Sequence, residues 1–347
     1  MVRHTKRFEK IAVTALVILL SVSLLGACSL IFAKEATPSL VPARSTTPAP
    51  PSLDDHPVWS IYGTDRTIAD VAPSSFRARC SYNLNDGLLL VGGSSGLIFS
   101  YDGTYWEKVS APLDTRDTVV DILYVDGHFY FVCTFSGIVS CDIHLRNFEV
   151  VCDTQNLWAI AYGDNQFIAV GSSIALYSND LETWSILDSS DYYDDVLFAE
   201  GKFILANRSR GTLYYLTDTL DLMPIDRPSS YPFVQIRDMY YSNGFVYMAS
   251  ASGEIYKTSI YDLSGWQLLL SANSGYTCFE KILFYEDRFF AVGYNSENKG
   301  VIYSSDNCVL WTSVGDIEFE KLWIVCYFED YVIAFGENAS SYFYKYN

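Results

Sequence analysis

Metal-binding residues are scarce in this chain. Only 4 histidines occur among 347 residues, and the 8 cysteines are scattered without a Cys-x-x-Cys pair. Structural zinc sites need clustered sulfur or imidazole ligands, and small disulfide-stapled domains need a denser cysteine framework. We therefore expect no metal site and no cofactor. Setting Cys28 aside leaves an odd number of cysteines, so at least one thiol stays unpaired within the chain.

Basic residues are also in short supply. Lysine and arginine number 23 against 41 aspartates and glutamates, which gives a net charge of -18. A surface of this sign does not attract nucleic acid or anionic lipid, so we expect no nucleic-acid partner. Acidic stretches such as 191–195 lack the Asp-x-Asp-x-Asp-Gly spacing of a calcium loop. Solubility is the favoured reason for the acidity, and cation binding is the alternative.

Helical periodicity is missing from the region after the N-terminal segment, and a repeated strand pattern takes its place. An alternating apolar run, a turn, a second run, a hairpin and a third run recur seven times between Arg79 and the C-terminus. The core residue before each hairpin falls at Val91, Val132, Val170, Ala206, Ala249, Val292 and Phe335, with spacings of 36 to 43 residues. Such a period is typical of four-stranded propeller blades. The pattern predicts an all-β, seven-bladed β-propeller over residues 57–347.

The ends of the repeat predict how the ring closes. The seventh copy stops after its third strand, at residues 341–346. Trp59 begins a short stretch that matches the fourth-strand pattern starting at Trp106, Trp184 and Trp311. We expect this N-terminal strand to complete the last blade, because a closed ring leaves no open sheet edge.

Three hairpins leading into fourth strands share a motif. Its serine, aspartate and tryptophan stand at Ser100, Asp102 and Trp106, at Ser178, Asp180 and Trp184, and at Ser304, Asp306 and Trp311. The motif resembles the Asp box, Ser-x-Asp-x-Gly-x-Thr-Trp, of the bacterial neuraminidase repeat superfamily, which includes sialidases, sortilin-like receptors and photosystem II assembly propellers. The resemblance implies that these residues are structural and lie away from the active face. Two copies are one residue shorter than the family pattern, and Glu182 and Cys308 stand at its glycine position.

The N-terminus reads as an export signal followed by a tether. Residues 1–27 combine basic residues up to Lys10 with an apolar run over 11–25, the pattern of a signal peptide. The end of this run, Leu-Gly-Ala followed by Cys28, resembles the bacterial lipobox, which implies lipidation of Cys28. A plain signal peptide or a single membrane anchor is the alternative. Residues 28–56 are rich in Pro, Ser and Thr and predict a disordered tether. We therefore expect a head on the extracytoplasmic side of a bacterial membrane, held by the lipid anchor only.

The candidate ligand site is the mouth of the propeller channel. Loops between blades, and loops between second and third strands, meet there on one face, where ligands usually bind. The first-strand entrances, twelve residues before the core positions, are Arg79, Val120, Trp158, Asp194, Arg237, Glu280 and Trp323. Charge and tryptophan are unexpected beside apolar strands, so these residues form a candidate site, together with Arg208 and Arg210 in the fourth hairpin. The alternative is that strand entrances are simply solvated.

These features favour a non-catalytic binding or scaffolding protein. We expect a monomer that recognises a protein or carbohydrate ligand at the channel mouth. The alternatives are a glycoside hydrolase of sialidase type and an assembly factor for a membrane complex, both suggested by the resemblance. A sialidase needs three arginines for its anionic substrate, a tyrosine nucleophile with a glutamate, and an acid. Only residues 76–79 approximate the Phe/Tyr-Arg-Ile-Pro motif of those enzymes, without its proline. We therefore predict no catalytic residue.

Overall fold

The computed structural model describes residues 59–60, 67–84, 87–228, 234–272, 276–314 and 318–345. The expected signal peptide, Cys28 and the tether up to residue 56 lie outside these ranges, as do residues 61 and 62 of the expected N-terminal strand. In the described part of the chain, no helix is long and apolar enough to cross a membrane.

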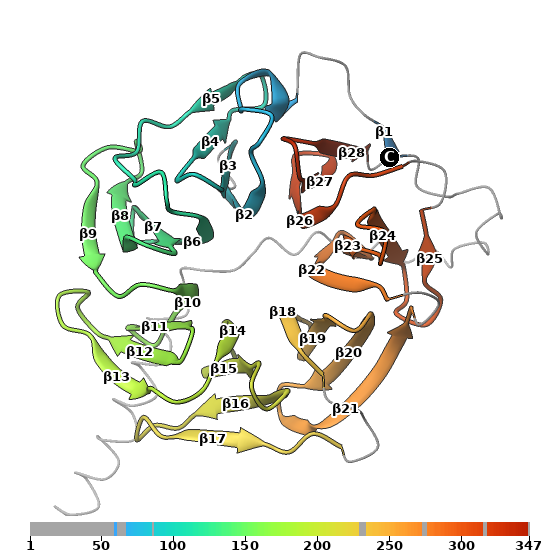
Figure 1. The fold of residues 1–347 in the computed structure, drawn as a ribbon. Helices are drawn as coiled ribbons and strands as arrows, with labels where there is room; N and C mark the ends of the chain where they lie inside the picture. The colour runs from blue at the N-terminus through green and yellow to red at the C-terminus, as the bar shows by residue number, and fades with distance from the viewer. Residues whose placement is uncertain are drawn as a thin grey trace, which may run out of the picture. The chain divides into compact units, whose positions relative to one another are not determined.

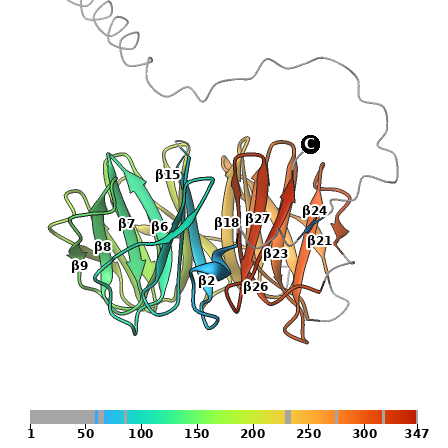
Figure 2. The ribbon, with the colours of Figure 1, turned by 90° about the horizontal axis from the view of Figure 1, so that it is seen from above.

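Seven four-stranded antiparallel sheets surround a central channel, which confirms the prediction of an all-β, seven-bladed propeller (Figure 1). Figure 2 shows that the strands run between the two faces of the ring, roughly along its axis. The first strands of the blades line the channel, and the fourth strands form the rim.

The strands follow one another in chain order within each blade. The first three blades contain β2 (Ala78–Leu84), β3 (Leu88–Gly93), β4 (Ile98–Tyr101) and β5 (Trp106–Lys108); β6 (Val119–Val125), β7 (His128–Cys133), β8 (Gly137–Asp142) and β9 (Glu149–Cys152); and β10 (Leu157–Gly163), β11 (Gln166–Gly171), β12 (Ile174–Ser178) and β13 (Ser185–Asp188). The next two contain β14 (Tyr193–Ala199), β15 (Lys202–Asn207), β16 (Thr212–Leu216) and β17 (Leu222–Ile225); and β18 (Ile236–Ser242), β19 (Phe245–Ser250), β20 (Glu254–Ser259) and β21 (Asp262–Ser271). The sixth contains β22 (Cys278–Tyr285), β23 (Arg288–Tyr294), β24 (Gly300–Ser305) and β25 (Thr312–Ser313).

The seventh sheet joins the two ends of the described chain. Its order is β1 (Trp59–Ser60), β28 (Ser341–Lys345), β27 (Tyr331–Gly336) and β26 (Leu322–Phe328). Trp59 lies opposite Tyr344 and is only 2% exposed. Its indole meets the Phe290 ring edge-on at 6.2 Å, so the short strand contributes a large side chain to the contact between the sixth and seventh blades.

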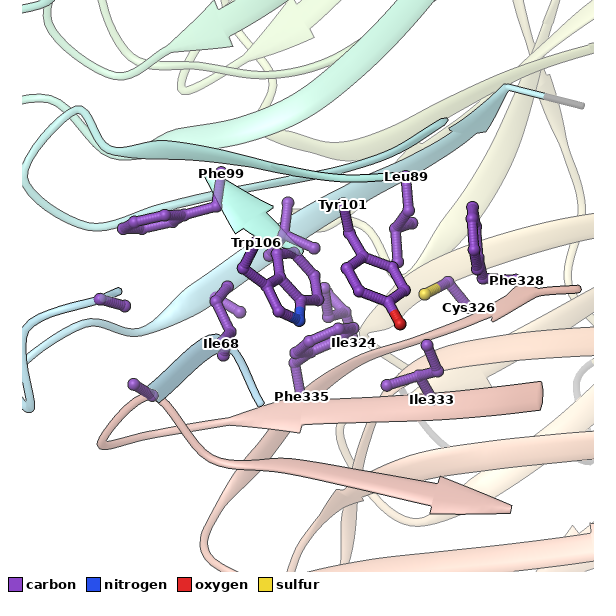
Figure 3. Close-up of a cluster of buried hydrophobic side chains, with 14 of the residues drawn as sticks. Ile68, Leu89, Phe99, Tyr101, Trp106, Ile324, Cys326, Phe328, Ile333 and Phe335 are labelled. Atoms are coloured by element: carbon purple, nitrogen blue, oxygen red, sulfur yellow. The ribbon is translucent and has the colours of Figure 1, made fainter. Parts of the chain in front are cut away.

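The apolar core lies between neighbouring blades. Each second strand is buried along almost its whole length because both of its faces pack on other blades. Figure 3 shows the cluster between the first and seventh blades. There Trp106 stacks on Tyr101 at 4.9 Å and meets Phe335 edge-on at 5.8 Å. Ile68, in the short 3-10 helix η2 (Ile68–Asp70), is fully buried in the same cluster.

The seven cysteines of the described ranges are all buried and unpaired. They are Cys80, Cys133, Cys141, Cys152, Cys278, Cys308 and Cys326. Desolvation raises the pKa of the Cys141 and Cys326 thiols to about 12, so these thiols stay neutral at physiological pH. They behave as small core side chains.

The hairpins of the Asp-box motif are held by local hydrogen bonds. Asp102 Oδ1 accepts the backbone N–H groups of Thr104 and Tyr105, both at 2.8 Å. Asp180 Oδ1 accepts those of Glu182 and Thr183 in the same way. These bonds stabilise the ionised carboxylates and lower the pKa of both aspartates.

The third hairpin requires a correction of one residue. The oxygen that accepts the turn N–H groups, from Val309 and Leu310, belongs to Asn307 and not to Asp306. The spacing to Trp311 explains the shift, since Ser305, Asn307 and Trp311 repeat the spacing of Ser178, Asp180 and Trp184, and Ser304 lies one residue too early. Asp306 forms an ion pair with Arg288 instead. The residues with positive φ after the turn oxygen are Gly103, Leu181 and Cys308, so the glycine position is Leu181 rather than Glu182.

Candidate ligand site at the channel mouth

Each channel-lining strand carries a β-bulge near its start. In β10, for example, Leu157 pairs with Gly171 and Ala159 with Val170, which leaves Trp158 without a partner in the ladder. The corresponding extra residues of the other blades are Arg79, Val120, Asp194, Arg237, Glu280 and Trp323. A bulge bends the strand and redirects its side chain. The seven predicted entrance residues are therefore the seven bulged residues.

These side chains meet in one cavity of about 440 Å³. All seven bulged residues line it, and so does Arg208 from the hairpin after β15. Arg210 does not line the cavity, because its guanidinium turns to Asp191 at 2.9 Å. Sequence reasoning missed the remaining lining residues, which are Thr118, Asp121, Thr134, Ala159, Asp195, Asp238, Lys281 and Tyr294. Five of them carried a sequence signal, because each directly follows a bulged residue: Asp121, Ala159, Asp195, Asp238 and Lys281.

Charges alternate along one side of the mouth. Asp194, whose side chain is 8% exposed, pairs with Arg208 at 3.2 Å and with Arg237 at 3.4 Å. Desolvation raises the pKa of Asp194, although both arginines oppose the shift. Desolvation also acts against the charge of Arg237, but Glu280 and Asp194 outweigh it and raise the pKa of that guanidinium. For Arg79, desolvation lowers the pKa of the guanidinium, and the charge of Glu280 partly opposes this shift.

The two tryptophans of the mouth have different surroundings. The Trp158 indole N–H donates to Ser172 Oγ at 3.0 Å, and its ring lies nearly parallel to Tyr192 at 6.3 Å. The Trp323 ring carries the Arg79 guanidinium at 3.7 Å and the Lys321 ammonium at 4.5 Å. Cations therefore lie over the Trp323 ring, whereas a hydrogen bond and an aromatic neighbour orient Trp158.

Four ionisable residues that directly follow bulged residues also line the cavity, and we refer to them as its floor: Asp121, Asp195, Asp238 and Lys281. Each aspartate accepts a backbone N–H from the next blade: Ile160 donates to Asp121 at 2.9 Å, Met239 to Asp195 at 2.7 Å, and Ile282 to Asp238 at 2.8 Å. Lys281 Nζ lies 2.5 Å from Asp238 Oδ1. The floor carboxylates thus connect neighbouring blades around the channel.

Desolvation in the channel raises the pKa of all three floor aspartates, and the charge of Lys281 opposes the shift. The same carboxylates raise the pKa of Lys281 despite its own desolvation, which favours the protonated amine. Within the described ranges, no group of three or more His, Cys, Asp or Glu side chains could hold a metal ion.

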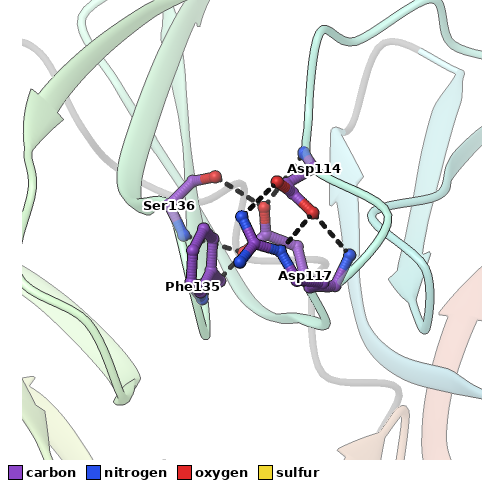
Figure 4. Close-up of polar contacts among 5 residues, drawn as sticks. Asp114, Asp117, Phe135 and Ser136 are labelled. Atoms are coloured by element: carbon purple, nitrogen blue, oxygen red, sulfur yellow. Dashed lines mark hydrogen bonds and ion pairs between the residues drawn. The ribbon is translucent and has the colours of Figure 1, made fainter.

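A buried aspartate holds the mouth of the channel in place beside Val120. Asp117 is 1% exposed, and its Oδ1 accepts the N–H groups of Phe135 and Ser136 at 2.7 and 2.8 Å (Figure 4). Arg116 lies over the Phe135 ring at 3.5 Å and pairs with Asp114. These contacts tie the link between the first two blades to the hairpin of the second, and they place Thr118 and Thr134 against the cavity.

No known protein-family model matches the sequence, and no curated protein matches it. Solved structures match at the level of the fold. Virginiamycin B lyase from Staphylococcus aureus, in a catalytically inactive form with quinupristin, has a TM-score of 0.68 at 9% identity and covers 84% of this chain and 100% of its own. YCF48 bound to D1 peptide has a TM-score of 0.64 at 12% identity and covers 86% and 99%. An extracellular domain assigned to a one-component system of B. thetaiotaomicron has a TM-score of 0.64 at 10% identity, and this chain spans 38% of that chain's length. At such identities the likeness shows a shared seven-bladed architecture.

Proposed function

We propose that this chain is a non-catalytic binding or scaffolding propeller that takes a protein or carbohydrate ligand at the channel mouth. The observation that carries the proposal is the convergence of seven bulged residues, one from each blade, on a single cavity. Bulges are common beside functional sites because they redirect side chains. A volume of about 440 Å³ falls within the range of small-ligand sites.

The mouth is also organised before any ligand arrives. Trp158 is held by Ser172, and Asp194 holds both Arg208 and Arg237. Such preorganisation lowers the entropy lost on binding. Solved propellers of the same architecture contain a D1 peptide in one case and quinupristin in another, which supports the use of this scaffold as a ligand platform.

The proposal includes the anchor and the closure of the ring. Cys28 is the lipidated residue, the Pro-rich segment up to residue 56 is the tether, and the strand at Trp59 closes a monomeric head on the extracytoplasmic side. The signal-like segment and the resemblance to the lipobox support this arrangement. Labelled palmitate uptake tests it. Cys28→Ala should abolish the label, whereas Cys80→Ala should retain it, and retention by both variants would contradict lipidation at Cys28.

A sialidase-like hydrolase is the second candidate function. It is favoured by one observation, namely that Arg79, Arg208 and Arg237 share the cavity with Tyr294 and Glu280. Against it, desolvation and the neighbouring Cys278 and Glu280 raise the pKa of Tyr294, which disfavours the phenolate that a nucleophile needs. Release of a fluorescent aglycone from a sialoside would establish this activity.

Binding by the full chain to membrane extracts and to glycan arrays tests the proposed function. We expect Arg237→Ala and Trp158→Ala to weaken capture of the ligand. Arg210→Ala is the matched control, because Arg210 lies in the same blade as Arg208 but outside the cavity lining. Equal capture by all three variants and the unmodified chain would refute a site at the mouth.

A further inference from the structure

Two adjoining parts of the mouth differ in chemistry. Val120 and Trp158 present an apolar and aromatic surface to the cavity. Next to them, Arg208, Asp194 and Arg237 alternate in charge over contacts of 3.2 and 3.4 Å, and the Arg208 guanidinium lies over the Tyr192 ring that also packs against Trp158. A ligand that fills the cavity therefore needs one apolar face and one edge rich in hydrogen-bonding groups.

The formal charges of the cavity side chains nearly cancel. Four cationic and five acidic side chains line it, and each mouth arginine has a carboxylate as an electrostatic neighbour. A ligand with a net charge would gain attraction from one sign and lose it to the other. A neutral ligand avoids this conflict.

Paired arginine and carboxylate groups suit hydroxyls in particular. Arg208 donates one N–H to Asp194, and its side chain is 32% exposed, so further N–H groups of its fork are free to donate. A hydroxyl both donates and accepts, so adjacent hydroxyls can bond an arginine and a carboxylate at once. Thr118 and Thr134 also line the cavity and add hydroxyl groups to it.

Trp158 supplies the complementary apolar surface. Tyr192 backs its ring, with 27° between the two planes, and Ser172 fixes the rotation of the indole. Trp158 is half-buried and lines the cavity, so part of its ring is available to a ligand there. A pyranose ring presents C–H groups on one face and hydroxyls around its edge, which matches this wall and the charged wall together.

We propose that the mouth binds a neutral hexopyranose unit, stacked on Trp158 with its hydroxyls on Arg208 and Asp194. This inference rests on the proposed function and narrows its ligand to an uncharged carbohydrate. A peptide is the competing class, and an acidic sugar is the competing carbohydrate.

An array of neutral hexose oligosaccharides, uronate and sialic acid glycans, and short peptides tests the assignment. The full chain is purified in a detergent without a sugar headgroup, because a glucoside or maltoside would compete. We expect binding to neutral oligosaccharides, and calorimetry with the best of them should show at least about 10-fold weaker binding for Trp158→Ala. Trp158→Phe, which keeps an aromatic face, should recover most of the loss.

Two further variants separate contact from folding. Arg208→Gln should weaken the same oligosaccharide about 10-fold, whereas Arg210→Gln, outside the cavity lining, should not. Val120→Trp adds bulk to the cavity wall and should weaken binding. Peptide or acidic-sugar binding lost in these variants would overturn the neutral-sugar assignment and leave the mouth site standing. Neutral-sugar binding that survives both Trp158→Ala and Val120→Trp would overturn the assignment as well, and no binding to any probe would overturn both proposals.

Discussion

Replacement of Lys281 by methionine probes the charge balance of the channel floor. The Asp238 side chain is 3% exposed, and its ammonium partner lies 2.5 Å away. Removing one partner of a buried ion pair costs about 3–5 kcal/mol. The Lys281 side chain is 42% exposed, so solvent screens part of this loss. We expect the free energy of unfolding to fall by about 1–3 kcal/mol, which lowers Tm by roughly 2–8 °C.

The pH dependence of this deficit gives the sharper test. Desolvation raises the pKa of Asp238 in the folded protein, and Lys281 opposes the shift. A carboxyl with a raised folded pKa binds more protons folded than unfolded, so stability falls as pH rises from about 4 through the folded pKa. Without the ammonium the folded pKa rises further. The deficit of Lys281→Met is therefore largest near pH 8 and shrinks toward pH 5.

Urea unfolding at these two pH values, followed by tryptophan fluorescence, measures the effect. Lys299→Met removes a lysine whose partner Glu318 is 86% exposed, and it should leave stability unchanged. The double variant Asp238→Asn with Lys281→Met should recover part of the loss, since no unpaired carboxylate is left at that position. A deficit that grows on acidification, or no deficit at either pH, would refute the proposed role of Lys281 as the counter-ion of the floor.

Three further changes test the fold and the bulges. Trp59→Ala should lower the free energy of unfolding by about 3–5 kcal/mol in thermal or urea unfolding, because the indole is 2% exposed and packs between two blades. Asn307→Ala should lower the free energy of unfolding by about 1–2 kcal/mol through the loss of two turn hydrogen bonds, and Asp306→Ala should lower it by less. The reverse order would indicate that Asp306 is the aspartate of the motif, as the sequence predicted. Gly171→Ala should cost about 1–3 kcal/mol and change the fluorescence of Trp158, since a Cβ would lie 2.2 Å from the carbonyl oxygen of the residue before β10; an unchanged spectrum would count against coupling to the bulge.

The repeat made the fold predictable because every blade needs the same hydrophobic alternation. The mouth residues were predictable for a related reason: the turn between first and second strands has nearly constant length, so a fixed count from the core reaches the bulge. In the first blade this turn is longer, with Leu84 opposite Leu88. There Val91 pairs with Ser81, whereas in the other blades the core position pairs with the residue directly after the bulge, as Val170 pairs with Ala159. The count still reached Arg79, because the position chosen as the core residue lay one step earlier along the second strand.

Counting residues from the core position could not predict the contacts of the floor aspartates or the acceptor residue of the third hairpin. Asp121 and its equivalents read as acidic residues in strands, and only the packing of one blade on the next shows that their oxygens accept N–H groups across the gap. In the third hairpin, Asp306 and Asn307 are adjacent and both carry a suitable oxygen. The choice between them depends on which side chain the turn directs inward, and that follows from the position of the tryptophan rather than from the chemistry of either residue.

The bulges have a partial sequence signal in the second strands. The residue opposite the one just before the bulge is glycine in four blades, and at all four, Gly93, Gly171, Gly293 and Gly336, a Cβ would lie 1.8 to 2.4 Å from a carbonyl oxygen across the ladder. Other blades hold a larger residue there, such as Cys133 or Asn207, and are bulged all the same. Glycine therefore allows the closest approach but does not cause the bulge. The feature that all seven blades share is that the bulge redirects a side chain of the channel-lining strand, and each of these side chains lines the cavity.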